Sequence, residues 1–356
     1  MMESLLKEWE GETVIVRHDQ LTGVWIFIAI HSTHLGPAAG GTRMKSYPDV
    51  QAALQDVFRL AAGMTYKFAI PGLPWGGGKA VVAIPSDFDP GSRAALLRRY
   101  GALVHQLRGL YYTGPDVGTS SADMDIIAET GAPYVFGRTQ AAGGAGPSGP
   151  ATALGVFTGI QVACEHLFGE TSLEGRRVLV QGAGSVGETL IEYLRATGAE
   201  VAFSEVDEVT IRRFRDEIGL KFVPTEAVYT AECDIFAPCA LGGILNADTI
   251  PQLKCRIVAG GANNQLADQR DAESLRARDI LYAPDYVINV GGAIILLGLE
   301  TLDWTRERVK EEIVETVRRV LRQVFELAAA QGITTEAAAS RIAQERLSGS
   351  GSDPSS

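Results

Sequence analysis

The chain has 356 residues, of which 46% are hydrophobic and 21% charged, and 43 acidic against 32 basic side chains give a net charge of −11. This length and hydrophobic content suit two globular domains of ordinary size. The acidic balance argues against nucleic acid as the main partner, because phosphate binding requires a concentrated basic surface.

Targeting and cysteine patterns favour a cytoplasmic protein. We expect no secretion signal and no membrane contact, since no apolar run of the roughly 20 residues that span a bilayer stands out. The four cysteines are scattered and form no Cys-x-x-Cys pair, which suits a reducing compartment. His31 and His34 have metal-like spacing without a third ligand nearby, so we predict no metal site.

The first elements are predicted to be a β-hairpin and a helix. Apolar runs over residues 12–30 flank a turn at 19–23, which is typical of a hairpin. The small residues of 35–43 predict a loop that ends in the cation Arg43. A helix then starts after Asp49, a plausible N-cap, and keeps one apolar face as far as Met64.

Two lysines, Lys67 and Lys79, follow on either side of a turn-rich segment that ends in three glycines, 76–78. We expect Lys67 at or just past the end of the helix and Lys79 at the entrance of a strand over 80–84. Two ammonium groups converging on one pocket depress each other's pKa, which makes a lysine basic near neutral pH. The alternative is two solvated surface lysines beside an ordinary glycine loop.

A second helix is predicted over 93–107, followed by a strand and turn at 111–119 that contain Asp116. An Asp after Pro is often only a turn former. A further helix begins near 121, and the Gly- and Pro-rich residues 143–150 break regular structure. We interpret this last segment as a linker between domains.

A dinucleotide-binding unit is predicted next. A helix over 151–167 precedes a strand at 177–181, a glycine turn, a helix as far as 194 and a strand at 200–204, the order such a unit needs. The turn would let backbone amides approach a pyrophosphate at Gly182, Gly184, Ser185, Val186 and Gly187. Glu205 ends the second strand; its carboxylate would accept ribose hydroxyls and repel a 2′-phosphate, which favours NAD over NADP. Helix capping is the alternative role for Glu205 or its neighbour Asp207.

Three further strands are predicted at 234–238, 256–259 and 280–282. Parallel sheets bind ligands at the carboxyl ends of their strands, where this chain carries Cys239, Ala240, Asn263, Asn264 and Asn289. The asparagines offer amide groups to nicotinamide or substrate, or serve only as turn residues. Helices are expected over 306–329 and 335–346, and a disordered tail over 348–356.

Several motifs in this order resemble one enzyme family. Residues 35–43, 63–67, Gly-Gly-Gly-Lys at 76–79, Thr-Gly-Pro-Asp at 113–116 and residues 284–289 resemble the glutamate/leucine/phenylalanine/valine dehydrogenases. The resemblance covers nearly the whole chain and is closest to the phenylalanine-specific members.

The resemblance implies an α/β fold, with an N-terminal α/β substrate domain, a C-terminal Rossmann-type doubly wound domain and a cleft between them. The expected parts are a substrate-binding, catalytic and oligomerisation domain, a linker, an NAD-binding domain, C-terminal helices that pack back toward the first domain, and a tail. Their bounds are residues 1–140, 141–150, 151–325, 326–347 and 348–356. The family also implies a homo-oligomer, and the exposed edge of the first hairpin is a natural pairing surface.

The implied activity is NAD-dependent oxidative deamination of an L-amino acid to a 2-oxo acid and ammonia, and its reverse. By position, Lys67 binds the substrate carboxylate with the backbone near Gly40 and Gly41, Lys79 is the general base, and Asp116 exchanges protons with the amino group. The resemblance further implies that Asn263 bridges substrate and nicotinamide, and that Thr152 touches the carboxamide.

The substrate side chain is expected to contact positions Ala39, Gly114, Ala293 and Leu296. Three of these are Gly or Ala and leave room for a bulky group, so we expect L-phenylalanine, with leucine, valine or tryptophan as alternatives. Trp75 is bulkier than the aliphatic residue expected there, and 64–67 looks leucine-type. A non-catalytic binding protein on the same fold is the other class, and it would be expected to lack Lys79 or Asp116.

Overall fold

The computed structural model describes residues 2–349, which form two compact units. Of the described residues, unit 1 holds those as far as Pro147 together with Leu299–Asp303 and those from Ala343 onward. Unit 2 holds Ser148–Gly298 and Trp304–Ile342. The tail expected to be disordered lies outside the described residues from position 350 onward.

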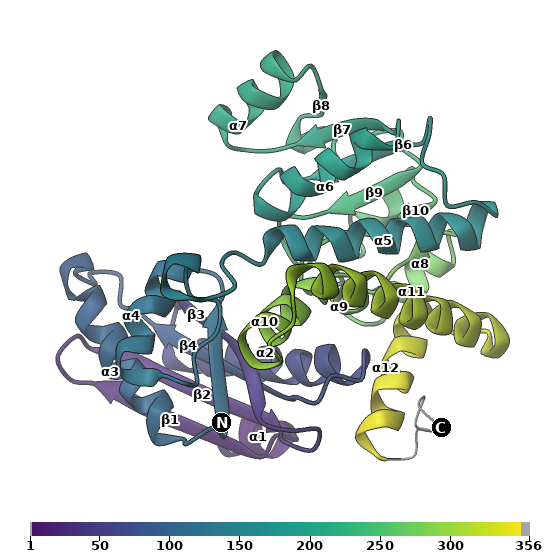
Figure 1. The fold of residues 1–356 in the computed structure, drawn as a ribbon. Helices are drawn as coiled ribbons and strands as arrows, with labels where there is room; N and C mark the ends of the chain where they lie inside the picture. The colour runs from purple at the N-terminus through teal and green to yellow at the C-terminus, as the bar shows by residue number, and fades with distance from the viewer. Residues whose placement is uncertain (1, 350–356) are drawn as a thin grey trace. The chain divides into compact units, whose positions relative to one another are not determined.

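Unit 1 is built on a mixed five-stranded sheet in the order β1-β2-β4-β3-β5 (Figure 1). The predicted hairpin is confirmed, since β1 and β2 pair antiparallel, and β4 pairs antiparallel with β2. β3 lies between β4 and β5 and is parallel to both. The strands are β1 (Thr13–Asp19), β2 (Val24–Ser32), β3 (Ala38–Lys45), β4 (Gly76–Ala83) and β5 (Tyr111–Pro115).

Helices cover both faces of this sheet. The alternation of side chains along β2 sends Phe27 and Ala29 into a core with α2, whereas Ile26 and Ile28 pack with Tyr100 of α3 on the other face. The helices are α1 (Met2–Glu8), α2 (Val50–Ala69), α3 (Arg93–Gln106) and α4 (Ser121–Gly131). Asp49 caps α2 as predicted, accepting a hydrogen bond from the Ala52 N–H.

Two predictions in the glycine-rich segments are wrong. Residues 38–45 form the strand β3 rather than a loop, and 76–78 begin β4, so Lys79 lies inside a strand and not at its entrance. The reason is close packing: a Cβ on Gly40 would lie 1.8 Å from the Gly78 carbonyl oxygen, and one on Gly77 would lie 2.0 Å from Thr65 Oγ1. Only glycine allows these backbones to approach so closely.

Unit 2 contains a six-stranded sheet in the order β11-β10-β9-β6-β7-β8, parallel throughout. This is the doubly wound dinucleotide-binding order, with its switch point between β6 and β9. The strands are β6 (Arg177–Gln181), β7 (Glu200–Ser204), β8 (Lys221–Phe222), β9 (Ile235–Pro238), β10 (Ile257–Val258) and β11 (Leu281–Tyr282). We did not predict β8, whose two residues are too short to give a periodic pattern.

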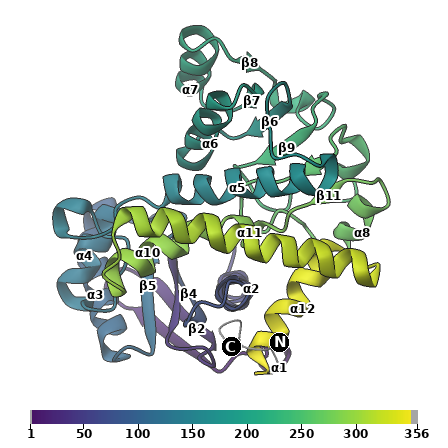
Figure 2. The same ribbon diagram turned by 45° about the vertical axis from the view of Figure 1, so that its right-hand side comes forward.

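The long helices of this unit pack side by side. In both views α5 runs along α11, and α5 also packs against α6 (Figure 2). Residues 285–288, which follow the last predicted strand, form the short helix α9. The helices are α5 (Gly149–Phe168), α6 (Ser185–Ala196), α7 (Glu208–Arg212), α8 (Asp271–Arg276), α9 (Asp285–Ile288) and α11 (Arg306–Gln331). Two more helices, α10 (Gly291–Thr301) and α12 (Thr335–Leu347), each contribute to both units.

Our expectation about apolar runs is wrong for α5. This helix is long and apolar enough to cross a membrane by length and composition alone. However, 56% of its most apolar window is buried, and its packing against α6 and α11 is that of a core helix.

Candidate active site

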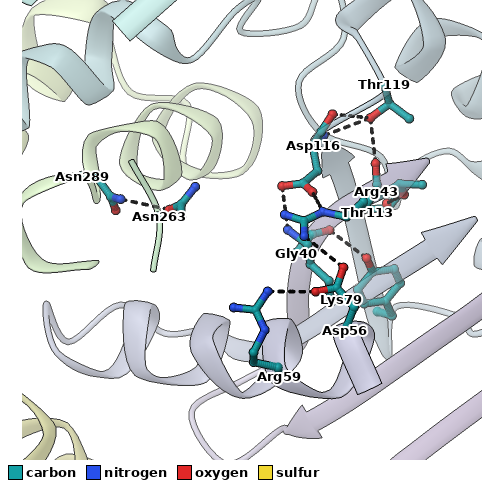
Figure 3. Close-up of polar contacts among 12 residues, drawn as sticks. Gly40, Arg43, Asp56, Arg59, Lys79, Thr113, Asp116, Thr119, Asn263 and Asn289 are labelled. Carbon is teal, nitrogen blue, oxygen red and sulfur yellow. Dashed lines mark hydrogen bonds and ion pairs between the residues drawn. The ribbon is translucent and has the colours of Figure 1, made fainter. Parts of the chain in front are cut away.

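An ion pair joins Lys79 of β4 to Asp116, which directly follows β5. The Lys79 Nζ lies 2.9 Å from Asp116 Oδ1, and the two side chains are only 6% and 14% exposed (Figure 3). β3 separates their strands, and the pair spans it next to Gly41, where a Cβ would lie 2.8 Å from the Asp116 Cβ. Gly41 therefore leaves the space that the Asp116 side chain occupies.

Arg43 is a second cation on Asp116, and our sequence reasoning did not include it among the site residues. Its Nε donates to Asp116 Oδ2 at 2.8 Å, and its Nη1 donates to Asp56 Oδ2 at 3.0 Å. Asp56 also accepts from Tyr47 Oη at 2.7 Å and from Arg59 Nη2 at 2.8 Å. Once 38–45 is known to be a strand, the two-residue spacing from Gly41 places Arg43 on the same face.

The charges around Asp116 determine its protonation. Burial raises the pKa of the Asp116 carboxyl, but Lys79 and Arg43 outweigh burial and bring that pKa to about 2. Asp116 is therefore a carboxylate throughout the neutral range. Burial and the hydrogen bond to Asp56 raise the pKa of Tyr47 well above its ordinary value, so its hydroxyl stays a donor.

Buried hydroxyls hold the strands beneath this pair. Thr42, Tyr100 and Thr113 are joined by hydrogen bonds of 2.5 to 3.0 Å, and Tyr111 Oη donates to the Gly40 carbonyl oxygen at 2.8 Å. Thr119 Oγ1 donates to the Thr42 carbonyl oxygen and accepts from the Asp116 N–H. These contacts fix the backbone from which Asp116 projects.

Lys67 lies in the last turn of α2, the helix on the face of the sheet toward which Lys79 points. The same helix approaches β4 through Thr65, which covers Gly77 and contacts His31 Nδ1 at 2.9 Å. A cation near a helix C-terminus is stabilised by the helix dipole. Convergence of Lys67 and Lys79 on one bound molecule stays a prediction.

Trp75 has a clear packing role. It meets Tyr112 edge-on at 4.9 Å and Phe136 at 5.4 Å between ring centroids, and Tyr112 stacks on Phe136 at 5.2 Å. We call these three residues the aromatic cluster. Tyr112 is paired with Ala39 in the β3–β5 ladder, so the aromatic cluster borders one of the two unit 1 positions expected to contact the substrate. The other, Gly114, is buried in β5.

In unit 2 each of the three glycines of the predicted turn occupies a different structural environment. Gly182 has φ +90°, and a Cβ on Gly187 would lie 1.9 Å from the Gly182 carbonyl oxygen. Gly184 is the N-cap of α6, has no side-chain cap, and has no atom within 4 Å of its Cβ position. The first amides of α6, at Ser185 and Val186, are therefore available to a phosphate.

Glu205 lies beyond β7 and contacts the glycine turn. Its Oε2 accepts from the Ala183 N–H at 2.8 Å, and its Oε1 accepts from the Val206 N–H at 2.7 Å. Capping of α7 falls to Asp207, which accepts from the Thr210 N–H. Asp207, and not Glu205, is therefore the N-cap of α7.

A polar cluster lies beyond the strands on the β9 side. Asn289 Nδ2 donates to Asn263 Oδ1 at 2.9 Å (Figure 3), and Asn264, at φ +52°, donates its N–H to Asp285 Oδ2 at 2.6 Å. Cys239 Sγ accepts from the Gly261 N–H, and burial raises the pKa of this thiol to about 12, so it is un-ionised.

The residues of unit 2 fit a dinucleotide. Among the described residues, buried side-chain oxygens without a hydrogen-bond partner include Gln181 Oε1, Ser204 Oγ and Asn289 Oδ1. Gln181 is the last residue of β6, directly before the glycine turn, and Ser204 is the last residue of the neighbouring strand β7. Ala240 packs against Gly182, as expected for a closely packed turn.

The other predicted residues are placed as follows. Thr152, in the first turn of α5, donates its hydroxyl to the Ser148 carbonyl oxygen, and Ala293 and Leu296 are half-buried on α10. Ala39 and Gly114 belong to unit 1, whereas Ala293 and Leu296 belong to unit 2. Within residues 2–349 no cluster of three His, Cys, Asp or Glu side chains could hold a metal ion.

Two family models match this chain. The Glu/Leu/Phe/Val dehydrogenase dimerisation domain matches residues 13–132, and the glutamate/leucine/phenylalanine/valine dehydrogenase model matches 143–213 and 202–351. The chain belongs to this dehydrogenase family. The resemblance drawn from its motifs is confirmed, as is the fold of an N-terminal substrate domain and a C-terminal Rossmann-type domain.

Its relatives act on different amino acids. The chain is 43% identical over 342 residues to leucine dehydrogenase of Geobacillus stearothermophilus, covering 96% of this chain and 92% of that one. It is 40% identical over 343 residues to phenylalanine dehydrogenase of Lysinibacillus sphaericus, covering 95% and 89%. The crystal structure of L-tryptophan dehydrogenase from Nostoc punctiforme superposes with a TM-score of 0.81 at 39% identity, covering 98% and 99%. The chain is thus an amino-acid dehydrogenase by family, and the relatives at about 40% identity differ in the amino acid for which they are named.

Proposed function

We propose that this protein is an NAD-dependent dehydrogenase that oxidatively deaminates an L-amino acid with a bulky side chain, with L-phenylalanine as the first candidate. The products are the 2-oxo acid and ammonia, and the reverse reaction is reductive amination. The observation that carries the proposal is the buried Lys79–Asp116 ion pair at 2.9 Å. A non-catalytic protein on this fold has no need of such a pair.

The residues of unit 1 can perform the hydrolytic steps. Lys67 pairs with the substrate carboxylate, aided by backbone amides near Gly40 and Gly41. After hydride loss the substrate is an iminium, and Lys79 takes a proton from the water that attacks it. Asp116, a carboxylate in this structure, accepts hydrogen bonds from the substrate amino group and exchanges its protons.

The residues of unit 2 would hold the cofactor, which accepts the hydride from the substrate α-carbon when bound. Leucine, phenylalanine and valine dehydrogenases of this family depend on NAD. The glycine turn would receive the pyrophosphate, and Glu205 the adenosine ribose, since a carboxylate oxygen accepts more than one hydrogen bond. Asn263, Asn289, Thr152, Cys239 and Ala240 are the proposed contacts of the nicotinamide end.

Small residues support a bulky substrate. Three of the four proposed side-chain positions, Ala39, Gly114 and Ala293, are Gly or Ala, and Tyr112 of the aromatic cluster is paired with Ala39. Aromatic rings favour edge-to-face contacts with another ring, which supports phenylalanine. Leucine is the second candidate, favoured by the leucine dehydrogenases at 40 to 43% identity.

Steady-state kinetics with Phe, Tyr, Trp, Leu and Val, each with NAD and with NADP, test this proposal. We expect the highest kcat/KM for phenylalanine with NAD. A higher value for leucine or valine would overturn the aromatic assignment, and absence of turnover with every amino acid would overturn the dehydrogenase assignment.

We also propose a cytoplasmic homo-oligomer. β1 is the edge strand of the unit 1 sheet, and its outer backbone groups can pair with β1 of a second copy. Light scattering during size-exclusion chromatography should give a mass at least twice the 38.0 kDa of one chain. A monomer at micromolar concentration would contradict the proposal.

A further inference from the structure

Asp116 is held by two cations, one on each carboxylate oxygen. Lys79 Nζ contacts Oδ1 at 2.9 Å, and Arg43 Nε contacts Oδ2 at 2.8 Å (Figure 3). The Asp116 and Arg43 side chains are both 14% exposed, so water screens this pair only weakly. Lys79 and Asp116 have proposed roles in the reaction, whereas Arg43 has none.

Arg43 is itself fixed at its far end. Its Nη1 reaches Asp56 Oδ2 at 3.0 Å, and Asp56 is held in turn by Tyr47 and Arg59. The guanidinium therefore bridges two carboxylates with different nitrogens, a geometry that the single nitrogen of lysine cannot reproduce. Because the guanidinium contacts Asp56 as well as Asp116, the position of Arg43 is fixed, and Arg43 in turn fixes the position of the Asp116 carboxylate.

The charge of Arg43 matters to the chemistry of the pair. A lone carboxylate beside an ammonium stabilises the ammonium, yet a general base must work without that proton. Arg43 stays charged at every pH at which proteins fold. Arg43 and Lys79 both interact with the negative charge of Asp116, so neither cation interacts with the whole of it. When Lys79 loses its proton, Arg43 remains beside the carboxylate as its positively charged partner.

We infer that Arg43 is a positioning residue of this active site: it fixes the Asp116 carboxylate and keeps it ionised while Lys79 changes protonation state. The inference rests on the proposed function of Lys79 and Asp116. Among the described residues, the charged or titratable groups in contact with the network are Lys79 on β4, Arg43 on β3, Tyr47 before α2, and Asp56 and Arg59 on α2. Lys45 on β3 lies over the Tyr47 ring, and Tyr111 on β5 interacts electrostatically with Asp116. Lys67 is on the same helix as Asp56, in its last turn.

The test is steady-state deamination by wild type, Arg43→Lys and Arg43→Gln across pH 7 to 11. For Arg43→Gln we expect kcat to fall about 100-fold, because a displaced catalytic group costs about this much. We expect KM for the amino acid to change less than about threefold and the rise of kcat with pH to move to higher pH. Arg43→Lys should be intermediate, since it keeps the charge and loses one contact. The matched control is Arg98→Gln, which removes an exposed ion pair between Arg98 on α3 and Glu129 on α4 and should leave kcat unchanged.

Wild-type kcat and an unshifted pH profile in folded Arg43→Gln would overturn the inference. If Arg43→Gln does not fold, Arg43→Lys decides in the same way, because wild-type kinetics there would show that the two-ended contact is not needed. Failure of the proposed function looks different: the wild type itself would not turn over any amino acid. Activity that is lost in Lys79→Ala and intact in Arg43→Gln would refute only the role of Arg43.

Discussion

Lys79 and Asp116 meet across a strand that belongs to neither of them. β3 runs between β4 and the end of β5, and Gly41 on β3 provides the gap that the Asp116 side chain fills. The pair thus depends on the absence of a side chain at a third position. This dependence explains why a small residue is required on β3, between β4 and β5.

Replacing Gly41 with Ala should therefore damage the site directly. The new Cβ would lie 2.5 Å from the Pro115 carbonyl oxygen and 2.8 Å from the Asp116 Cβ, so the backbone and side chain that carry the carboxylate must shift from their present position. We expect kcat to fall about 100-fold, with NADH binding to unit 2 retained. Kinetics and NADH fluorescence titration measure the two effects. A fully active Gly41→Ala variant would show that the position of Asp116 is not critical.

The pKa of Asp116 predicts how stability changes in acid. This pKa is lowered from 3.8 to about 2 in the folded protein, so the stabilisation is complete above about pH 4 and is lost as pH falls toward 2. The shift corresponds to about 2 kcal/mol of unfolding free energy. Urea unfolding at pH 5 and pH 2.5 should show a wild-type advantage over Asp116→Asn that shrinks by about this amount. An advantage that is equal at both pH values would contradict the predicted shift.

Glu336 on α12 should make the folded protein less stable as pH rises, which is the opposite of the effect of Asp116. Burial, aided by the charge of Asp285, raises the pKa of this carboxyl from 4.5 to about 8, against hydrogen bonds from Tyr286 and Ser340 that lower it. A raised folded pKa contributes stability that is complete below about pH 4.5 and disappears as pH rises through 8. Glu336→Gln should gain at least about 1 kcal/mol relative to wild type between pH 5 and pH 9. Thermal unfolding at the two pH values measures this gain, and parallel pH dependence of the two proteins would refute it.

The role of Glu205 can be tested by removing its charge alone. Glu205→Gln keeps an acceptor for the Ala183 N–H and loses the repulsion toward a 2′-phosphate. We expect the ratio of kcat/KM for NAD to that for NADP to fall about tenfold or more, since a charge contact is worth about 1.5 kcal/mol or more. Asp207→Asn is the matched control, because asparagine also caps a helix. An unchanged ratio in Glu205→Gln would move the choice of cofactor to other residues.

The sequence predicted elements best where side-chain periodicity is strong. The bounds of β6 and β7 around the glycine turn are those expected, and the N-cap of α2 at Asp49 is correct. β3 and the start of β4 do not follow from the sequence, because residues 38–41 and 76–78 are all Gly or Ala and carry no alternating apolar and polar pattern. What makes them strands is the proximity of Thr65, Gly78 and Ser32, contacts distant in sequence.

The same limit applies to the site. Lys79 and Asp116 were chosen from motifs, and the structure places them in contact. The small residues of 35–43 predict a loop that ends at Arg43, and a loop gives no register from which to place this side chain beside Asp116. Long-range pairing between β3 and β5, rather than local pattern, brings these residues together.

The most direct test of the proposed active site is Lys79→Ala. Asp116 keeps Arg43 as a partner in this variant, so the protein should fold, and NADH binding should match the wild type. We expect kcat for oxidative deamination to fall about 10³-fold or more, the contribution of a general base, whereas Lys310→Ala on the exposed face of α11 should be fully active. Substantial deamination by Lys79→Ala would contradict the assignment of Lys79 as the base.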